Sequence, residues 1–153
     1  METLEEVIVE HPFFRGLRAE YVTLIARCAG NVRFAPSQYL FHEGEIADRF
    51  FLVRRGLVSL EIFVPGRGPV SIQTVGEQEV IGWSWMVRPY RWRYTARALE
   101  QTRAVAFDAS CMRRKCDANH DLGYEMMLRF AGIISYRLQA TRLQFMDIYS
   151  LNG

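Results

Sequence analysis

Short runs of β-forming residues, separated by glycine and proline, occupy the middle of the chain from Val32 to Phe107. The clearest runs are residues 50–53, 57–63, 70–75 and 94–107. Turn-forming glycines accompany them at positions 44, 56, 66, 68, 76 and 82. Many short strands with closely spaced glycine turns are typical of all-β rolls. The pattern therefore predicts a small jelly roll or β-roll rather than a parallel sheet.

Helical patterns flank these runs on both sides. Residues 1–29 carry apolar side chains at helical spacing and predict short helices. Asp108 is the expected N-cap of a short helix that ends near Cys116, and the longest helical pattern extends from about Leu122 to Ile148. We expect a single α+β, mainly β domain over residues 1–153, made of a helical N-terminus (1–30), a β-roll (31–107) and C-terminal helices (108–153).

The long C-terminal helix carries two apolar stripes. The first, here called the seam, alternates spacings of four and three residues and comprises Met127, Ala131, Ile134, Leu138, Thr141, Phe145 and Ile148. Such spacing suits a partner helix, so we predict a homodimer through the seam. The second stripe is suited to face the roll and comprises Leu122, Met126, Phe130 and Ile133. The alternative is one wide stripe that packs only on the chain's own core.

Charge and composition argue against several classes of protein. The net charge of +2 is too small to indicate nucleic acid or a membrane surface as a partner. The acidic start lacks the features of a secretory signal, and no window is long and apolar enough to span a membrane. The three cysteines show no C-x-x-C spacing, which disfavours a disulfide framework or an iron–sulfur site. We expect free, at least half-buried thiols in a cytoplasmic protein.

Two segments carry a recognisable family pattern. Residues 43–56 read Glu-Gly-Glu-Ile-Ala-Asp-Arg-Phe-Phe-Leu-Val-Arg-Arg-Gly, and Gly76 precedes Val80-Ile81-Gly82. With the helical flanks, these segments resemble the cyclic nucleotide-binding domain of the catabolite-activator type. The resemblance implies a ligand-sensing regulatory domain whose long helix forms a dimer interface. Relatives that control transcription continue into a helix-turn-helix domain. Because the chain ends at Gly153, just after the helix, we expect no direct DNA binding by this chain.

The resemblance places the family's phosphate-binding cassette at residues 82–98. In the family, a short helix after a glycine points backbone N–H groups at the phosphate. A glutamate next to the glycine binds the ribose hydroxyl, and an arginine ten residues after the glycine pairs with the phosphate. Counted from Gly82, these positions are Trp83 and Trp92, and Tyr94 stands where a small residue is expected. Losing an ion-paired contact costs about 1.5–3 kcal/mol, so we predict weak or no binding of cyclic AMP.

Alternation along the cassette strand bears on the remaining alternatives. It puts one set of side chains on one face, Arg91, Arg93, Thr95 and Arg97, and the opposite set on the other, Trp92, Tyr94, Ala96 and Ala98. If the aromatic face looks inward, a register slip that brings Arg91 or Arg93 to a phosphate fails. If the arginine face looks inward instead, Arg91 or Arg93 would bind the phosphate, and the chain would be a cyclic nucleotide binder.

The aromatic residues of the cassette allow two interpretations. They either plug an unused cavity or wall a pocket for a different small-molecule effector, with an arginine such as Arg88 supplying an anion contact. On either interpretation, the candidate ligand-binding residues are Gly82, Trp83, Ser84, Trp85, Arg91, Trp92, Arg93, Tyr94 and Thr95.

Two further functions are alternatives to a sensor. In one, the pocket is filled and the chain is a ligand-free dimeric module that binds a protein partner. In the other, the roll is a cupin-like metal enzyme, for which only His42 with Glu43 and Glu45 is a partial match. Ser84 is expected to cap the cassette helix rather than act as a nucleophile. The common catalytic motifs are missing from the sequence, so we predict no enzymatic activity, no metal and no resident cofactor.

Overall fold

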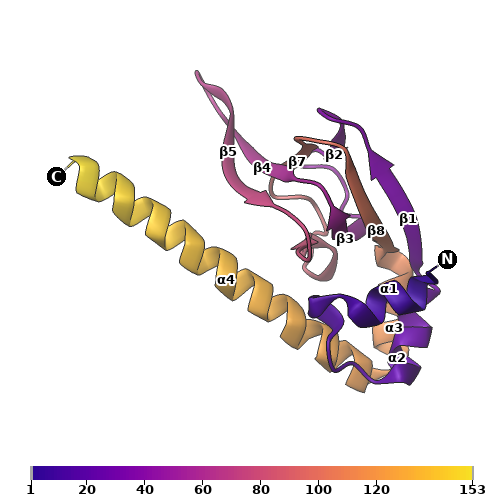
Figure 1. Ribbon diagram of the computed structural model, residues 1–153. Coiled ribbons are helices and arrows are strands. Elements are labelled where there is room, and N and C mark those ends of the chain that lie inside the picture. The colour runs from indigo at the N-terminus through magenta and orange to yellow at the C-terminus, as the bar shows by residue number, and fades with distance from the viewer. Residues whose placement is uncertain (1, 153) are drawn as a thin grey trace.

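The computed structural model describes residues 2–152 as a β-roll flanked by helices (Figure 1). The N-terminal part comprises α1 (Leu4–Glu10), the 3-10 turn η1 (Pro12–Phe14) and α2 (Ala19–Ala26). The roll comprises β1 (Ala29–Phe34), β2 (Tyr39–Phe41), β3 (Arg49–Arg55), β4 (Val58–Val64), β5 (Gly68–Val75), β6 (Val80–Ile81), the 3-10 turn η2 (Ser84–Met86), β7 (Thr95–Ala98) and β8 (Thr102–Asp108). Two helices close the chain, α3 (Ala109–Ala118) and α4 (His120–Asn152).

Two four-stranded antiparallel sheets form the roll, in the orders β1-β8-β3-β6 and β2-β7-β4-β5. β8 lies in the middle of the first sheet, where Phe107 pairs with Ala29 of β1 and with Phe50 of β3. This arrangement confirms the predicted jelly-roll architecture with N-terminal helices and a long C-terminal helix. All strand pairs are antiparallel, and only β4 and β5 are consecutive in the chain, so most connections cross from one sheet to the other.

β3 is buried on both of its faces. One face looks into the roll, where Phe51 contacts Phe34 and Phe41 with ring centroids 5.8 and 6.3 Å away. The opposite face is covered by the helices, and there Phe50 stacks on Phe107 at 4.6 Å and meets Phe130 of α4 edge-on at 5.1 Å. Burial on both sides explains why residues 50–53 are continuously apolar instead of alternating.

The predicted flanking helices are confirmed, and side-chain caps mark the starts of α1 and α3. Thr3 and Glu6 form a reciprocal capping box at the start of α1. The carboxylate of Asp108 accepts a hydrogen bond of 2.8 Å from the backbone N–H of Cys111 and caps α3, as expected from the sequence. Both caps satisfy backbone donors that the first turn of a helix leaves unpaired.

The run at residues 94–107 is two strands and not one. β7 belongs to the second sheet and β8 to the first, and the chain changes sheets at residues 99–101. The change happens beside Gly56, where an added Cβ would lie 2.4 Å from the hydroxyl oxygen of Thr102. Gly56 has a φ of +115°, so its lack of a side chain permits both the backbone conformation and this close approach. Residues 99–101 contain no glycine or proline, so nothing in the sequence marked a turn between the two strands.

A disulfide joins Cys28 to Cys111, so the expectation of three free thiols is wrong. β1 and β8 pair antiparallel, with Ala29 opposite Phe107. The residue before β1 therefore lies next to the residues after β8, and the backbone N–H of Asp108 donates to the carbonyl oxygen of Cys28 at 2.9 Å. Sequence spacing could not reveal this neighbourhood because 83 positions separate the two cysteines.

Cys116 is the free thiol among the described residues. Burial, followed by the nearby charge of Asp117, raises the pKa of the Cys116 thiol to about 11. The side chain is therefore protonated at neutral pH and is a poor nucleophile.

α4 presents the two predicted apolar faces to different surroundings. Leu122, Met126 and Phe130 are buried against the roll and the other helices, and Ile133 is half-buried. Every seam residue is exposed, so the alternative of one wide stripe packed on the chain's own core is wrong. The C-terminal half of α4 extends away from the roll (Figure 1). No described helix has the length and hydrophobicity needed to cross a membrane.

Candidate functional site

The cassette begins where β6 ends, at Gly82. Gly82 has a φ of +106°, a conformation that L side chains rarely adopt. η2 follows and spans only Ser84–Met86, with Trp83 at its N-cap and no side-chain cap hydrogen bond. The expectation that Ser84 caps this helix is therefore wrong. Its hydroxyl oxygen is buried and has no hydrogen-bond partner among the described residues, because the turn starts one residue too early for it.

Trp92 fills the space beneath this glycine. Its side chain is 2 % exposed, and its ring lies 3.5 Å from the ring of Phe41 with the two planes 8° apart. The far edge of the indole reaches Gly82, where an added Cβ would lie 2.6 Å from Cη2 of Trp92. The rigid ring system cannot yield at that distance, so a side chain at position 82 and the indole could not coexist.

Tyr94 places its hydroxyl at the same end of the roll. The ring is buried and lies 5.7 Å from Phe41 and 6.3 Å from Trp92, measured between ring centroids. Nη1 of Arg137 donates to the Tyr94 hydroxyl oxygen at 3.5 Å. Burial raises the pKa of the Tyr94 phenol, while the charge and hydrogen bond of Arg137 and the backbone of Gly82 act to lower it. The phenol oxygen thus lies between a cation and the cassette glycine.

Arg137 connects α4 to the cassette. Besides reaching Tyr94, its Nη2 donates to the backbone carbonyl oxygen of Val80, the first residue of β6. A guanidinium has five N–H donors in a planar fork and can hold both acceptors at once. The sequence analysis missed Arg137 because it lies on the predicted dimer helix, outside the cassette. The available signal was its spacing, because Arg137 lies four residues after Ile133 and continues the stripe that faces the roll.

The predicted alternation along the cassette strand is confirmed. Trp92, Tyr94, Ala96 and Ala98 are buried, whereas Arg91 and Arg93 are exposed. Nη1 of Arg91 donates to the carbonyl oxygen of Gly44 at 2.9 Å, so this arginine holds the neighbouring turn. Neither Arg91 nor Arg93 is directed to the interior in this arrangement.

Arg97 is engaged on the outer surface as well. Its Nη2 lies 2.9 Å from Oε2 of Glu61, and this ion pair couples β7 to β4. Glu61 is a buried carboxylate, and the paired guanidinium supplies the charge partner that a buried carboxylate requires. Arg97 therefore has a structural partner within its own sheet.

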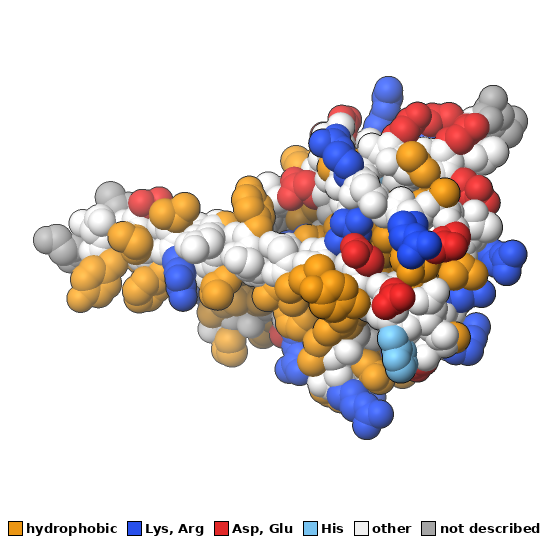
Figure 2. Space-filling view, turned by 90° about the horizontal axis from the view of Figure 1, so that it is seen from below, with side chains coloured by type: hydrophobic (Ala, Val, Ile, Leu, Met, Phe, Trp, Pro, Cys, Tyr) orange, Lys and Arg blue, Asp and Glu red, His pale blue; other side chains and the backbone are white. Residues whose placement is uncertain are grey.

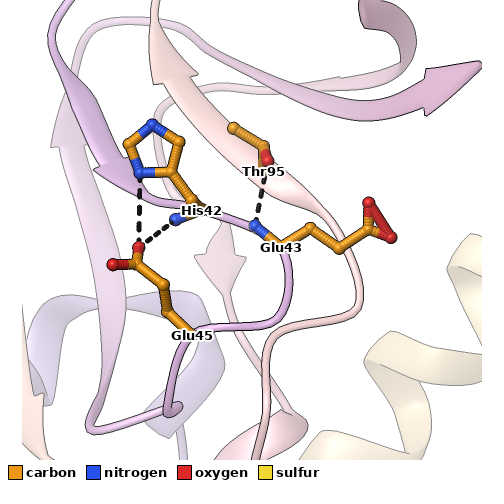
Figure 3. A network of polar contacts seen from close by, with 4 residues as sticks. All are labelled: His42, Glu43, Glu45 and Thr95. Carbon is orange, nitrogen blue, oxygen red and sulfur yellow. Dashed lines mark hydrogen bonds and ion pairs between the residues drawn. The ribbon is translucent and has the colours of Figure 1, made fainter.

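Thr95 has a structural role (Figure 3). Its hydroxyl oxygen accepts a hydrogen bond of 3.0 Å from the backbone N–H of Glu43, which ties the turn after β2 to the cassette strand. In the same turn, Oε1 of Glu45 accepts from the backbone N–H of His42 at 2.7 Å and lies 3.3 Å from Nδ1 of its ring. The carboxylate of Glu43 points away from His42 and Glu45.

These contacts bear on the metal alternative. His42 and Glu45 satisfy one another in an exposed turn. Across residues 2–152 no cluster of three or more histidine, cysteine, aspartate or glutamate side chains has a geometry that could hold a metal ion.

The cassette aromatics do not form one common wall. Trp92 and Tyr94 are in the roll interior, but Trp85 faces the helices, where it stacks on Phe50 at 5.2 Å and meets Phe130 at 5.5 Å. Tyr90 lies outside the roll under the guanidinium of Arg113. Trp83 is half-buried and packs against the core. Sequence reasoning grouped these rings because they are close in the chain, whereas η2 and the following turn send them to different sides.

Comparison with known proteins agrees with this architecture. The cyclic nucleotide-binding domain family matches residues 31–119. A protein from Geobacter metallireducens, described as a cyclic nucleotide-binding protein, is 27% identical with a TM-score of 0.79 and covers 90% of this chain and 99% of its own. The sensor domain of the transcriptional regulator DNR from Pseudomonas aeruginosa is 16% identical with a TM-score of 0.71, over 88% of this chain and 91% of its own.

A longer protein is similar over most of this chain. The catabolite activator protein of Thermus thermophilus is 21% identical with a TM-score of 0.69, over 91% of this chain and 63% of its own. None of the curated protein sequences compared with this chain matches it.

Proposed function

The chain belongs to the cyclic nucleotide-binding domain family, and we propose that it is a regulatory module whose cassette is filled by its own side chains. The observation that carries this proposal is the position of Trp92, buried beneath Gly82 and stacked on Phe41. A cyclic nucleotide would have to displace an indole that stacks on Phe41 with one face and reaches Gly82 with its edge. Displacing a buried aromatic ring from such a site costs about 3–5 kcal/mol, roughly half of the about 8 kcal/mol that a micromolar ligand gains on binding.

Tyr94 takes the place of a ligand oxygen in this proposal. Its hydroxyl accepts from Arg137 and lies at the cassette glycine, where the resemblance puts the ligand's polar groups. Arg137 then keeps α4 against β6 without a bound molecule, since its other hydrogen bond goes to Val80. The module would therefore hold one arrangement of α4 irrespective of the cyclic nucleotide concentration.

Titration calorimetry with cyclic AMP and cyclic GMP tests this function. We expect no binding tighter than about 10 μM to the unmodified chain. The matched variant carries Trp83→Glu, Trp92→Arg and Tyr94→Ser, which restores the two charges and removes the phenol. A gain of at least about tenfold in affinity for this variant supports the filled cassette. Low-micromolar binding to the unmodified chain contradicts it.

The second part of the proposal is a homodimer through the seam. Its support is the row of exposed seam residues, and Figure 2 shows hydrophobic side chains along the part of α4 that projects beyond the roll. Residues 141–150 are all exposed, and an isolated helical segment of this length is marginal in water. A second copy would cover both seams at once by a two-fold contact of identical surfaces.

We propose no catalytic role for the chain, because among the described residues the hydroxyl groups of Ser84, Tyr94 and Thr95 have no hydrogen bond to a histidine or carboxylate that could act as a base. A dimeric module of this kind would act on a protein partner. The proposed setting is the cytoplasm.

A further inference from the structure

A second pocket lies outside the roll, between the cassette turn and the corner formed by α3 and α4. Its volume is about 500 Å³, within the range of small-molecule sites. Side chains from three separate segments line it, including Trp85, Arg88, Tyr90, Arg113, His120 and Tyr124. It is separate from the cassette interior because neither Trp92 nor Tyr94 contributes to it.

The apolar walls of this pocket are aromatic rings and thioethers. Tyr90 and Tyr124 provide accessible rings, and Met86 and Met127 provide accessible thioethers. Trp85 and Met126 lie behind them and are almost fully buried. Methionine side chains adapt their shape and make favourable contacts with aromatic rings. A planar ring of a ligand therefore finds suitable surfaces in this pocket.

The charge of the pocket is predominantly positive. Arg88 and Arg113 line it, with Asp117 as the acidic residue. Arg113 is held in place, because its Nη1 donates to the carbonyl oxygen of Trp85 at 2.7 Å and its guanidinium lies 4.3 Å from the centre of the Tyr90 ring. Within the described chain, neither arginine forms an ion pair with a carboxylate. Their charges are thus available to an anion.

The pocket also spans a corner of the fold. α3 ends at Ala118, Asn119 has an extended backbone, and α4 begins at His120. Gly123 allows the two helices to approach, since an added Cβ would lie 3.3 Å from the carbonyl oxygen of Cys116. A molecule in the pocket would contact the cassette turn and both helices at this corner.

We propose that this pocket binds a small organic anion with an aromatic ring, and that Arg88 and Arg113 hold its carboxylate while the rings and methionines surround its body. The ligand would link the cassette turn to the start of α4 and favour one orientation of the helix. The site does not depend on whether the cassette interior is filled. The chain would then sense a metabolite outside the roll.

Calorimetric titration of the full chain with phenylacetate tests the proposal, with neutral phenylacetamide as the matched ligand. We expect saturable binding of phenylacetate and at least about tenfold weaker binding of phenylacetamide. Arg88→Gln should weaken phenylacetate binding about tenfold. Because the Arg88 side chain is exposed, the substitution should not unfold the protein, and weaker binding would reflect the lost charge. Arg67→Gln, at the exposed turn between β4 and β5, removes the same charge elsewhere and should leave the affinity unchanged.

The indole N–H resonances of the three tryptophans locate the bound molecule. The resonance that disappears in the variant Trp85→Phe is assigned to Trp85. Phenylacetate should shift this resonance. The absence of saturable binding up to about 10 mM, equal affinity for phenylacetamide, or full affinity in Arg88→Gln would each overturn the proposal. A titration of the same protein with cyclic AMP tests the proposed function of the cassette separately. Cyclic AMP should not compete with phenylacetate, because the pocket lies outside the roll.

Discussion

The indole of Trp92 lies parallel to the ring of Phe41, with centroids 3.5 Å apart and planes inclined by 8°. Phe41 ends β2, and Trp92 precedes β7, its partner strand. The pair therefore closes the roll at the level of Gly82 and occupies space that the family resemblance assigns to a ligand.

Trp92→Ala should lower the free energy of unfolding by about 3–5 kcal/mol, because it removes a buried ring and leaves a cavity. Trp83→Ala is the matched control, and its half-buried side chain should cost less. Urea denaturation followed by circular dichroism measures both. A loss below about 1 kcal/mol for Trp92→Ala would show that the indole does not support the roll.

Arg137→Ala should loosen α4 from the roll. The variant leaves the Tyr94 hydroxyl and the Val80 carbonyl oxygen without their donor, at a cost of about 1–3 kcal/mol. Hydrogen exchange of the α4 amides should accelerate in this variant. Arg142→Ala, one to two turns further along and exposed, should exchange like the unmodified chain. Equal protection in the two variants would rule out the proposed connection.

Ile134→Asp should convert the proposed dimer to a monomer. It places a charge without a partner in the apolar seam, which is costly to bury. Gln139→Asp adds the same charge at an exposed position outside the seam and should leave the dimer intact. Sedimentation velocity at micromolar concentration reports both masses. A monomeric unmodified chain would refute the dimer.

Thiol titration tests the Cys28–Cys111 pairing. The unfolded, unreduced protein should present one thiol per chain, and the reduced protein all three. Reduction should lower the free energy of unfolding by about 2–4 kcal/mol, since the bond closes a long loop. In the folded, unreduced protein at pH 8, Cys116 should react slowly because its pKa is raised to about 11. Three reactive thiols before reduction would disprove the pairing.

His11 should make stability depend on pH. Burial lowers the pKa of His11 from its usual 6.5, and Nδ1 accepts from the backbone N–H of Phe13 at 3.2 Å. A depressed pKa means that the unfolded chain binds the proton more tightly. The contribution of His11 to stability is thus present above pH 6.5 and is lost as the pH falls through the folded-state pKa.

The variant His11→Asn keeps a side-chain acceptor but does not titrate in this range. Thermal melts between about pH 7 and pH 5 should show a smaller loss of stability for His11→Asn than for the unmodified chain. His42→Asn replaces an exposed histidine and should resemble the unmodified chain. Parallel curves for all three proteins would contradict a role for His11.

Local patterns in the sequence were sufficient for much of the fold. Glycine-separated β runs indicate the roll, Asp108 marks the start of α3, and the two stripes on α4 follow from helical periodicity alone. The strand period of two also predicted which cassette residues are buried. These features succeeded because each depends on neighbours within a few residues, whose side-chain directions follow from backbone geometry.

Tertiary structure decided the features that involve distant residues. Antiparallel pairing of β1 with β8 brings Cys28 to Cys111, and the packing of α4 on the roll brings Arg137 to Tyr94. The direction of Trp85 was also undetermined, because a three-residue turn can send a ring to either side of a sheet. Contacts between residues far apart in the chain depend on how whole elements pack, and no local spacing encodes that packing.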